Sequence, residues 1–216
     1  LHSAGRDDSV RPVAQRAQPS PCTRTGPGVA GAIKPEFVDY GGNLVFSGVV
    51  SLRRVDEEHG TAVMSFSREP LRRLFAFNVG TSFAAPRIAR VAAMVWHRLR
   101  DQLHRDPDPN LVRAVLATAA TVPEAVQICL ANGPDHAVIR ACGYGLLDEG
   151  LATESADRRV TLIAQGAIQL DRFVVYEVPI PMEFVNAQGV KSITVGLAFD
   201  PPVRRRRQEY LGVHLN

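Results

Sequence analysis

A change of sequence period at Gly80 restricts the fold of this chain more than any other feature. The residues before it, RRLFAFNV, have the composition of a β-strand, and the stretch from Ser82 to Leu103 repeats apolar residues every three or four positions. That spacing predicts an amphipathic to nearly buried helix, with Pro86 near its first turn, where a missing N–H is tolerated. The sequence therefore predicts a strand, a tight glycine turn and a long helix in direct succession.

The serine at this turn has two interpretations. As a helix cap, Ser82 or Thr81 would satisfy a free backbone N–H and contribute about 1 kcal/mol. As a nucleophile, Ser82 would lie beside outward-pointing N–H groups and a helix dipole that favour developing negative charge. Gly80 would let a substrate backbone approach closely. Spacing alone favours the cap, and Ala84 stands where the Gly-x-Ser-x-Gly elbow requires glycine.

Longer motifs around the turn resemble the subtilisin-like serine proteases, the subtilase family. GTSFAAP resembles the Gly-Thr-Ser-x-Ala-x-Pro signature around the nucleophile of that family. Upstream, SPCTRTGPGVAGAIKPEFVDYGGN resembles a segment with a Ser-x-x-Gly-Pro turn, Lys-Pro-Asp/Glu and a glycine turn. Downstream, PNLVRAVLATAA and GYGLLDEGLAT resemble the next helix and a Gly-x-Gly-x-Leu/Ile-Asn/Asp motif. The resemblance runs in order over residues 18 to 155.

The resemblance implies an α/β fold and a serine endopeptidase. Residues 1–155 would be the C-terminal portion of a catalytic domain built on a parallel sheet. Ser82 would be the catalytic nucleophile, and Gly80, Thr81 and Ser82 would form the nucleophile turn, in which the Ser82 N–H supplies half of the oxyanion hole. Thr81 and Pro86 would be structural. Arg87 and Arg90 depart from the family's usual His-Val-Ala-Gly continuation.

The other members of a subtilase triad are expected upstream, because the family's chain order is Asp, His, Ser. HGTAV at His59 and VDYGG at Asp39 mimic the corresponding motifs. We reject both, since His59 lies too few residues before Ser82 and Asp39 falls in a different turn. The oxyanion asparagine is also missing, because no asparagine precedes Asn43 and Asn78 is expected to be structural. We therefore expect a fragment that is inactive by itself.

Elements elsewhere are predicted from turn residues and composition. Residues 1–30 have a loop composition. Asn110 is expected to cap a second helix, and Asp148-Glu149 to cap a short one, rather than to act as paired acids. Residues 156–216 contain apolar runs at 158–168, 172–184 and 191–200, which predict a small β-rich C-terminal extension.

Composition excludes several classes of protein. A net charge of +3 does not indicate a nucleic-acid binder, and no apolar run is suited to spanning a bilayer. Arg204–Arg207 is expected to be a solvated turn, with a patch for phosphate or an acidic partner as the alternative. The odd cysteine count argues against a disulfide scaffold, although one bridge between Cys129 and Cys142 is allowed.

No cofactor is predicted from the residues. His97 and His104 lie seven positions apart on the long helix, and a metal pair there is the minor alternative to surface histidines. Calcium is common in the family, but no carboxylate-dense loop marks a site. The expected partner is a protein or peptide substrate, while substrate specificity and oligomeric state cannot be read from the sequence. The cysteines favour the cytoplasm, with secretion as an alternative.

Two other functions remain open. The first is a non-catalytic subtilase-fold module for binding or scaffolding, with the C-terminal unit as its contact surface. The second is the related sedolisin class, whose Gly-Thr-Ser serine works with Glu and Asp at acidic pH. Upstream Asp-x-Gly and His-Gly-Thr motifs at the family spacing would favour the subtilase endopeptidase.

Overall fold

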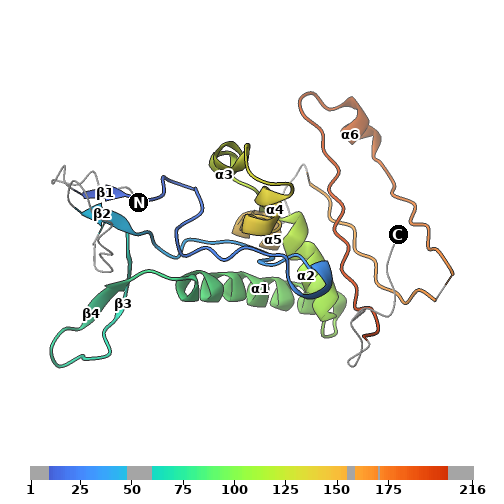
Figure 1. The fold of residues 1–216 in the computed structure, drawn as a ribbon. Helices are drawn as coiled ribbons and strands as arrows, with labels where there is room; N and C mark the ends of the chain where they lie inside the picture. Colours follow the sequence, from blue (N-terminus) through green and yellow to red (C-terminus); the bar gives the residue numbers. More distant parts are fainter. Residues whose placement is uncertain (1–9, 48–59, 155–158, 170, 204–216) are drawn as a thin grey trace.

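Helix α1, Thr81–Leu103, is the longest element and runs through the middle of the molecule (Figure 1). The computed structural model describes residues 10–47, 60–154, 159–169 and 171–203. The predicted helix is confirmed, and its apolar stripe is buried at Val91, Val95 and Leu99. Helix α1 ends at Leu103, and the next residue, His104, adopts the left-handed conformation that often follows a helix.

Helix α2, Pro109–Thr118, packs against α1 and completes the main core. This core consists of three residues of α1 and three of α2: Val91, Val95, Leu99, Leu111, Val112 and Leu116. Asp108, not Asn110, caps α2, because the Asp108 side chain accepts a hydrogen bond from the Asn110 N–H at 2.8 Å. The predicted cap was therefore two residues late, since Pro109 already occupies the first helical position.

A smaller second core lies beyond α2. It is built by α3 (Glu124–Leu130) and α4 (Ala137–Cys142), two helices that the sequence did not predict, around Val126, Ala141 and Cys142. All three cysteines are free, so the allowed bridge between Cys129 and Cys142 is not formed. Helix α5, Glu149–Thr153, begins as predicted, because the Asp148 side chain accepts from the Leu151 N–H at 2.9 Å.

The strands form three antiparallel pairs in the described residues. Strand β1 (Val10–Pro12) pairs with β2 (Val45–Ser47), and β5 (Ala120–Thr121) pairs with β6 (Leu146–Leu147). Strands β3 (Val63–Phe66) and β4 (Phe75–Asn78) form a hairpin that projects beyond the start of α1 (Figure 1). One parallel contact occurs, an isolated bridge from Val38 to Leu146. A short 3₁₀ turn spans Val29–Gly31.

The chain therefore mixes helices and strands, but the described residues do not contain the predicted parallel sheet. Parallel strands require a long crossover connection, whereas β3 and β4 are joined by a short turn that allows only antiparallel pairing. The α/β class is consistent with the element content, and the parallel arrangement is not confirmed.

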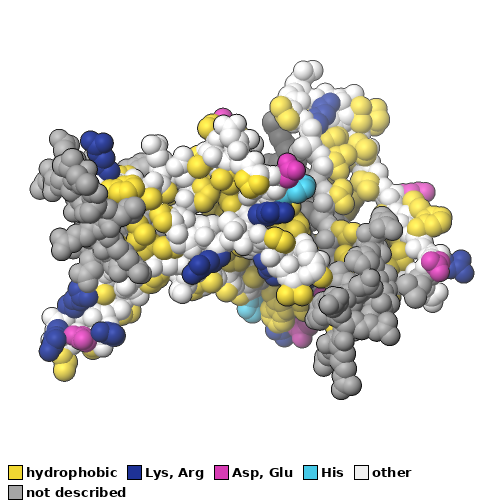
Figure 2. Space-filling model, in the orientation of Figure 1, with side chains coloured by type: hydrophobic (Ala, Val, Ile, Leu, Met, Phe, Trp, Pro, Cys, Tyr) yellow, Lys and Arg dark blue, Asp and Glu magenta, His cyan; other side chains and the backbone are white. Residues whose placement is uncertain are grey.

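The described residues between 159 and 202 form long extended segments with one short helix, α6 (Met182–Asn186), and no β-strand (Figure 1). The strands predicted there are not confirmed, because their backbones lack paired neighbours. Their apolar side chains stay in solvent: Phe173 is 85% exposed and Val190 fully exposed. Figure 2 shows yellow hydrophobic side chains gathered along this part of the surface. The predicted boundary near residue 155 stays a prediction, and Arg204–Arg207 lies outside the described residues.

Residue Gly196 brings one extended segment against α2. A Cβ there would lie 2.7 Å from the Ala114 carbonyl oxygen and from a Thr118 methyl group, so only glycine permits this approach.

The described helices include none that is long and apolar enough to cross a membrane.

Candidate active site

The sequence from β4 into α1 places Ser82 on the first turn of the helix. Strand β4 ends at Asn78, Gly80 occupies the N-cap position with an extended backbone, and Thr81 begins the helix. No side chain caps this end of α1, so the interpretation of Ser82 or Thr81 as an N-cap is wrong. The Ser82 side chain is exposed, and its hydroxyl has no hydrogen-bond partner among the described residues.

Backbone donors at this turn are partly free. The Phe83 N–H donates to the Gly80 carbonyl at 3.1 Å, whereas the Ser82 N–H has no partner within the described ranges. Pro86 has no N–H to donate to the Ser82 carbonyl four residues earlier, so the first turn of α1 also lacks one helical bond. A free N–H at a helix N-terminus is suited to stabilising an oxyanion.

The loop 39–43 lies against the turn and fixes its backbone. The Gly80 N–H donates to the Gly41 carbonyl at 2.8 Å. A Cβ on Gly41 would lie 2.5 Å from the Gly80 carbonyl oxygen, so a larger residue would force the two backbones apart. Sequence reasoning did not find this contact, although the adjacent pair Gly41-Gly42 was an available signal.

Residue Gly80 has open space around it, unlike Gly41. A Cβ on Gly80 would meet only the Ser82 nitrogen, at 3.9 Å, and its φ of 167° is open to any residue. The described part of the chain therefore gives no packing reason for glycine at this position. A requirement for glycine would have to come from a group that approaches the turn.

No described histidine accepts a proton from Ser82. His97 and His104 lie near the far end of α1, and His136 precedes α4. His59 lies outside the described residues, so our rejection of it stays a prediction. Asp39 accepts a hydrogen bond from Arg87 Nε at 2.8 Å, and our rejection of it as a triad member likewise stays a prediction.

The two arginines that depart from the usual family pattern both have acidic partners. Arg87 pairs with Asp39, and both terminal nitrogens of Arg90 contact the Glu149 carboxylate, one of them at 3.0 Å. Because of these contacts the pKa of Arg90 is raised and that of Glu149 is lowered. Helix α1 is continuous through Arg90, so an arginine at this position is accommodated on its surface.

A model of the subtilase family matches residues 7–145. The chain belongs to the subtilase family. The matched range includes the Ser82 turn, the 39–43 loop, α1 and α2, and it stops before α5.

The comparison with curated proteins gives a relative of this subtilase chain. An uncharacterized protein, y4bN, of Sinorhizobium fredii (strain NBRC 101917 / NGR234) is 40% identical over 211 residues, which are 97% of this chain and 48% of that protein. The subtilase chain thus spans about half the length of this relative. No solved structure matches the chain significantly.

In the described part of the subtilase chain, His, Cys, Asp and Glu side chains do not assemble in a group of three or more that could hold a metal ion. His97 and His104 therefore have no third such ligand in the described residues. Burial raises the pKa of the Cys142 thiol, which makes this cysteine a poor thiolate ligand.

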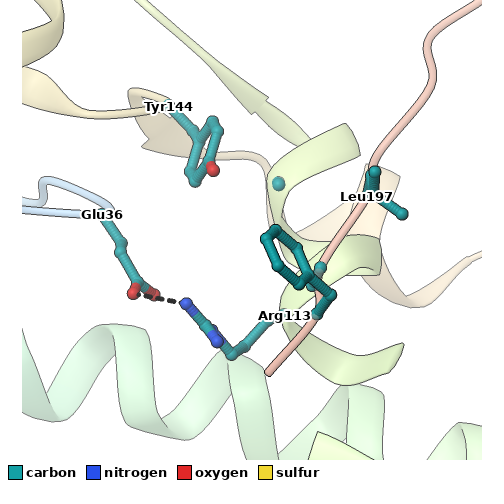
Figure 3. A pocket seen from close by; sticks show the side chains of 7 residues that line it. Glu36, Arg113, Tyr144 and Leu197 are labelled. Atoms are coloured by element: carbon teal, nitrogen blue, oxygen red, sulfur yellow. Dashed lines mark hydrogen bonds and ion pairs between the residues drawn. The ribbon is translucent and has the colours of Figure 1, made fainter. Parts of the chain in front are cut away.

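A cavity of about 140 Å³ lies beside α2, and Ser82 is not among its lining residues. Figure 3 shows Glu36 and Arg113 paired at one side of this cavity, with Tyr144 and Leu197 around it. The Glu36 carboxylate accepts from Lys34 Nζ at 2.7 Å and from an Arg113 terminal nitrogen at 2.9 Å. Burial by itself would raise the pKa of Glu36, but the hydrogen bonds and charges of Lys34 and Arg113 outweigh it and lower the pKa.

We predict that the free energy of unfolding falls less steeply toward acidic pH in Glu36→Gln than in the wild-type protein. The folded-state pKa of Glu36 is lowered, so its ionised form stabilises the fold above the unfolded pKa of about 4.3, and this contribution is lost as pH falls through the folded pKa. Arg113 is 47% exposed, so solvent screening limits the effect to about 1 kcal/mol at neutral pH. Urea unfolding of the wild-type and Glu36→Gln proteins at several pH values between neutral and acidic measures this difference in the free energy of unfolding.

Glu177→Gln is the control for this prediction, because the exposed Glu177 side chain makes no ion pair in the part of the chain that the structure describes. Its unfolding should follow the wild-type pH profile. An unchanged profile for Glu36→Gln would show that the Glu36 pair does not stabilise the fold.

Proposed function

We propose that this chain carries the nucleophile of a subtilisin-type serine endopeptidase, with Ser82 as the attacking residue. The observation that carries the proposal is that the Ser82 side chain and N–H are free of partners in the described residues. Its exposed hydroxyl neither caps the helix nor hydrogen bonds to another described residue, and its N–H is free at the N-terminus of a 23-residue helix. Membership of the subtilase family supports a peptidase of this kind.

The proposed reaction proceeds through an acyl-enzyme. The Ser82 Oγ attacks the carbonyl carbon of a peptide bond while a general base takes the hydroxyl proton. The negative oxygen of the tetrahedral intermediate accepts a hydrogen bond from the Ser82 N–H, aided by the dipole of α1. The amine leaves with the proton returned by the base, and water then releases the acyl group by the same steps in reverse order.

The base and the carboxylate that orients it are proposed to come from other parts of the full-length protein. This chain spans only 48% of the length of its relative, and the described histidines are not bonded to Ser82. The open space at Gly80 supports a protein or peptide substrate, because a substrate backbone could approach the turn there without meeting a side chain.

Fluorophosphonate labelling tests the proposal. The reagent phosphonylates a serine only when an assembled base activates its hydroxyl. We expect the full-length protein to be labelled and its Ser82→Ala variant to be unlabelled. A folded full-length protein that takes up no label would contradict the proposal and favour a non-catalytic subtilase-fold module for binding or scaffolding.

A further inference from the structure

Segment 39–41 contacts α1 on both sides of Ser82. Two residues before Ser82, the Gly80 N–H donates to the Gly41 carbonyl at 2.8 Å. Five residues after it, Arg87 Nε donates to Asp39 Oδ1, also at 2.8 Å. A short piece of the preceding loop therefore holds the helix start at two points, with the serine between them.

The carboxylate end of this contact is well fixed. The Asp39 side chain is only 13% exposed, and its Oδ1 also accepts the Tyr40 N–H at 2.6 Å. Arg87 is 60% exposed, so the helix side of the pair is more open to solvent than the Asp39 side. Asp39 thus offers a defined position to which the first turns of α1 are attached.

The helix start needs such an attachment more than an ordinary helix does. Pro86 lies between Ser82 and Arg87 and removes the hydrogen bond that would join residue 86 to the Ser82 carbonyl. The backbone of α1 is therefore least constrained by its own hydrogen bonds where the serine lies. An ion pair one residue beyond the proline replaces part of that constraint from outside the helix.

We propose that Asp39 and Arg87 are positioning residues for Ser82, which they hold in line with the free N–H at the turn. This inference rests on the proposed function of Ser82 as a nucleophile. Loss of the pair should allow the serine to shift, and a displacement of about 1 Å at a reacting group can cost about 100-fold in rate. Because the proposal gives the pair a role in holding Ser82 and none in binding substrate, kcat should fall and KM should change little.

The chain contains a matched control on the same helix. Arg90 pairs with Glu149 at the start of α5, and its hydrogen bonds go to Glu149 and not to segment 39–41, although the Asp39 charge also contributes to the raised pKa of Arg90. Asp39→Asn and Glu149→Gln each convert one carboxylate into the amide of the same shape, so they remove comparable ion pairs. Only the first is expected to affect Ser82.

The experiment uses the full-length protein and measures the rate of fluorophosphonate labelling, kcat and KM for a peptide substrate, and thermal stability. We expect Asp39→Asn and Arg87→Gln to lower kcat and the labelling rate by about 10- to 100-fold, with KM nearly constant. Glu149→Gln should leave all three kinetic values unchanged. Exchange of the two charges, Asp39→Arg with Arg87→Asp, should recover part of the lost rate.

Equal kinetic losses for Asp39→Asn and Glu149→Gln would overturn the inference, as would normal kinetics in both Asp39→Asn and Arg87→Gln. If Asp39→Asn does not fold, the exposed Arg87→Gln variant decides the question by itself. Failure of the proposed function looks different, because the wild-type protein would then take up no label at all.

Discussion

Ser82→Ala in the full-length protein is expected to lower kcat for peptide hydrolysis by on the order of 10⁶-fold, the loss seen when a serine-protease triad loses its nucleophile. In the proposed mechanism alanine removes the oxygen that forms the acyl-enzyme, while the N–H of residue 82 and the dipole of α1 remain. A residual rate above that in water should therefore persist. Hydrolysis of a fluorogenic peptide measures the loss in kcat, and long incubation of the variant with the same peptide measures its residual rate.

Ser65→Ala is the control for this variant. Ser65 lies on β3, opposite Ala76 in the hairpin that leads to the Ser82 turn. Its loss should leave kcat unchanged. Ser82→Ala is also expected to fold normally, because the Ser82 hydroxyl neither caps α1 nor bonds to another described side chain. Wild-type activity in Ser82→Ala would remove the nucleophile from the proposed mechanism.

The parts of the fold that the sequence predicted are those with a local signal. Helix α1 was predicted because apolar residues recur every three or four positions from Ile88 to Leu99, over about three turns. The end of β4 was located by Gly80, which follows it closely. Helices α3 and α4 were missed because they have only seven and six residues, too few for a period to stand out.

Strand pairing was the part that the sequence could not provide. Apolar runs beyond residue 158 have strand composition, but a strand also needs a neighbour with which to exchange hydrogen bonds, and the described residues there have none. The parallel sheet was expected from the family resemblance, whereas the described strands form antiparallel pairs between strands that are consecutive along the chain. The composition of a segment indicates its tendency to form a strand, and the presence of a neighbouring strand decides whether it does.

In the candidate site, too, the features with a local sequence signal were predicted and the contacts between distant residues were not. Ser82 and its turn were located from a seven-residue motif. The supports of that turn join residues far apart in sequence, since Asp39 and Arg87 are separated by 48 positions. No local pattern encodes such a contact. The arginine at position 87 was noticed only as a departure from the family, and its partner became visible in the structure.

Leu99→Ala is expected to lower the free energy of unfolding by about 2–5 kcal/mol. Leu99 is 4% exposed and lies in the core between α1 and α2, where its loss removes buried apolar area and leaves a cavity. Total stabilities of domains are about 5–15 kcal/mol, so the loss would be a large share. Chemical denaturation monitored by circular dichroism measures it. Leu71→Ala, at a fully exposed leucine between β3 and β4, should change stability by less than about 0.5 kcal/mol.

The Leu99 and Asp39 variants should separate stability from chemistry. Leu99 lies about 25 Å along α1 from Ser82, at a rise of 1.5 Å per residue, and it touches none of the groups that hold the Ser82 turn. In the full-length protein, Leu99→Ala should therefore label with fluorophosphonate at the wild-type rate at temperatures well below its lowered unfolding midpoint. Asp39→Asn should show the reverse, with a small loss of stability and a large loss of rate. Slow labelling in Leu99→Ala at such temperatures would mean that the packing of α1 on α2, rather than the contact with segment 39–41, sets the position of the serine.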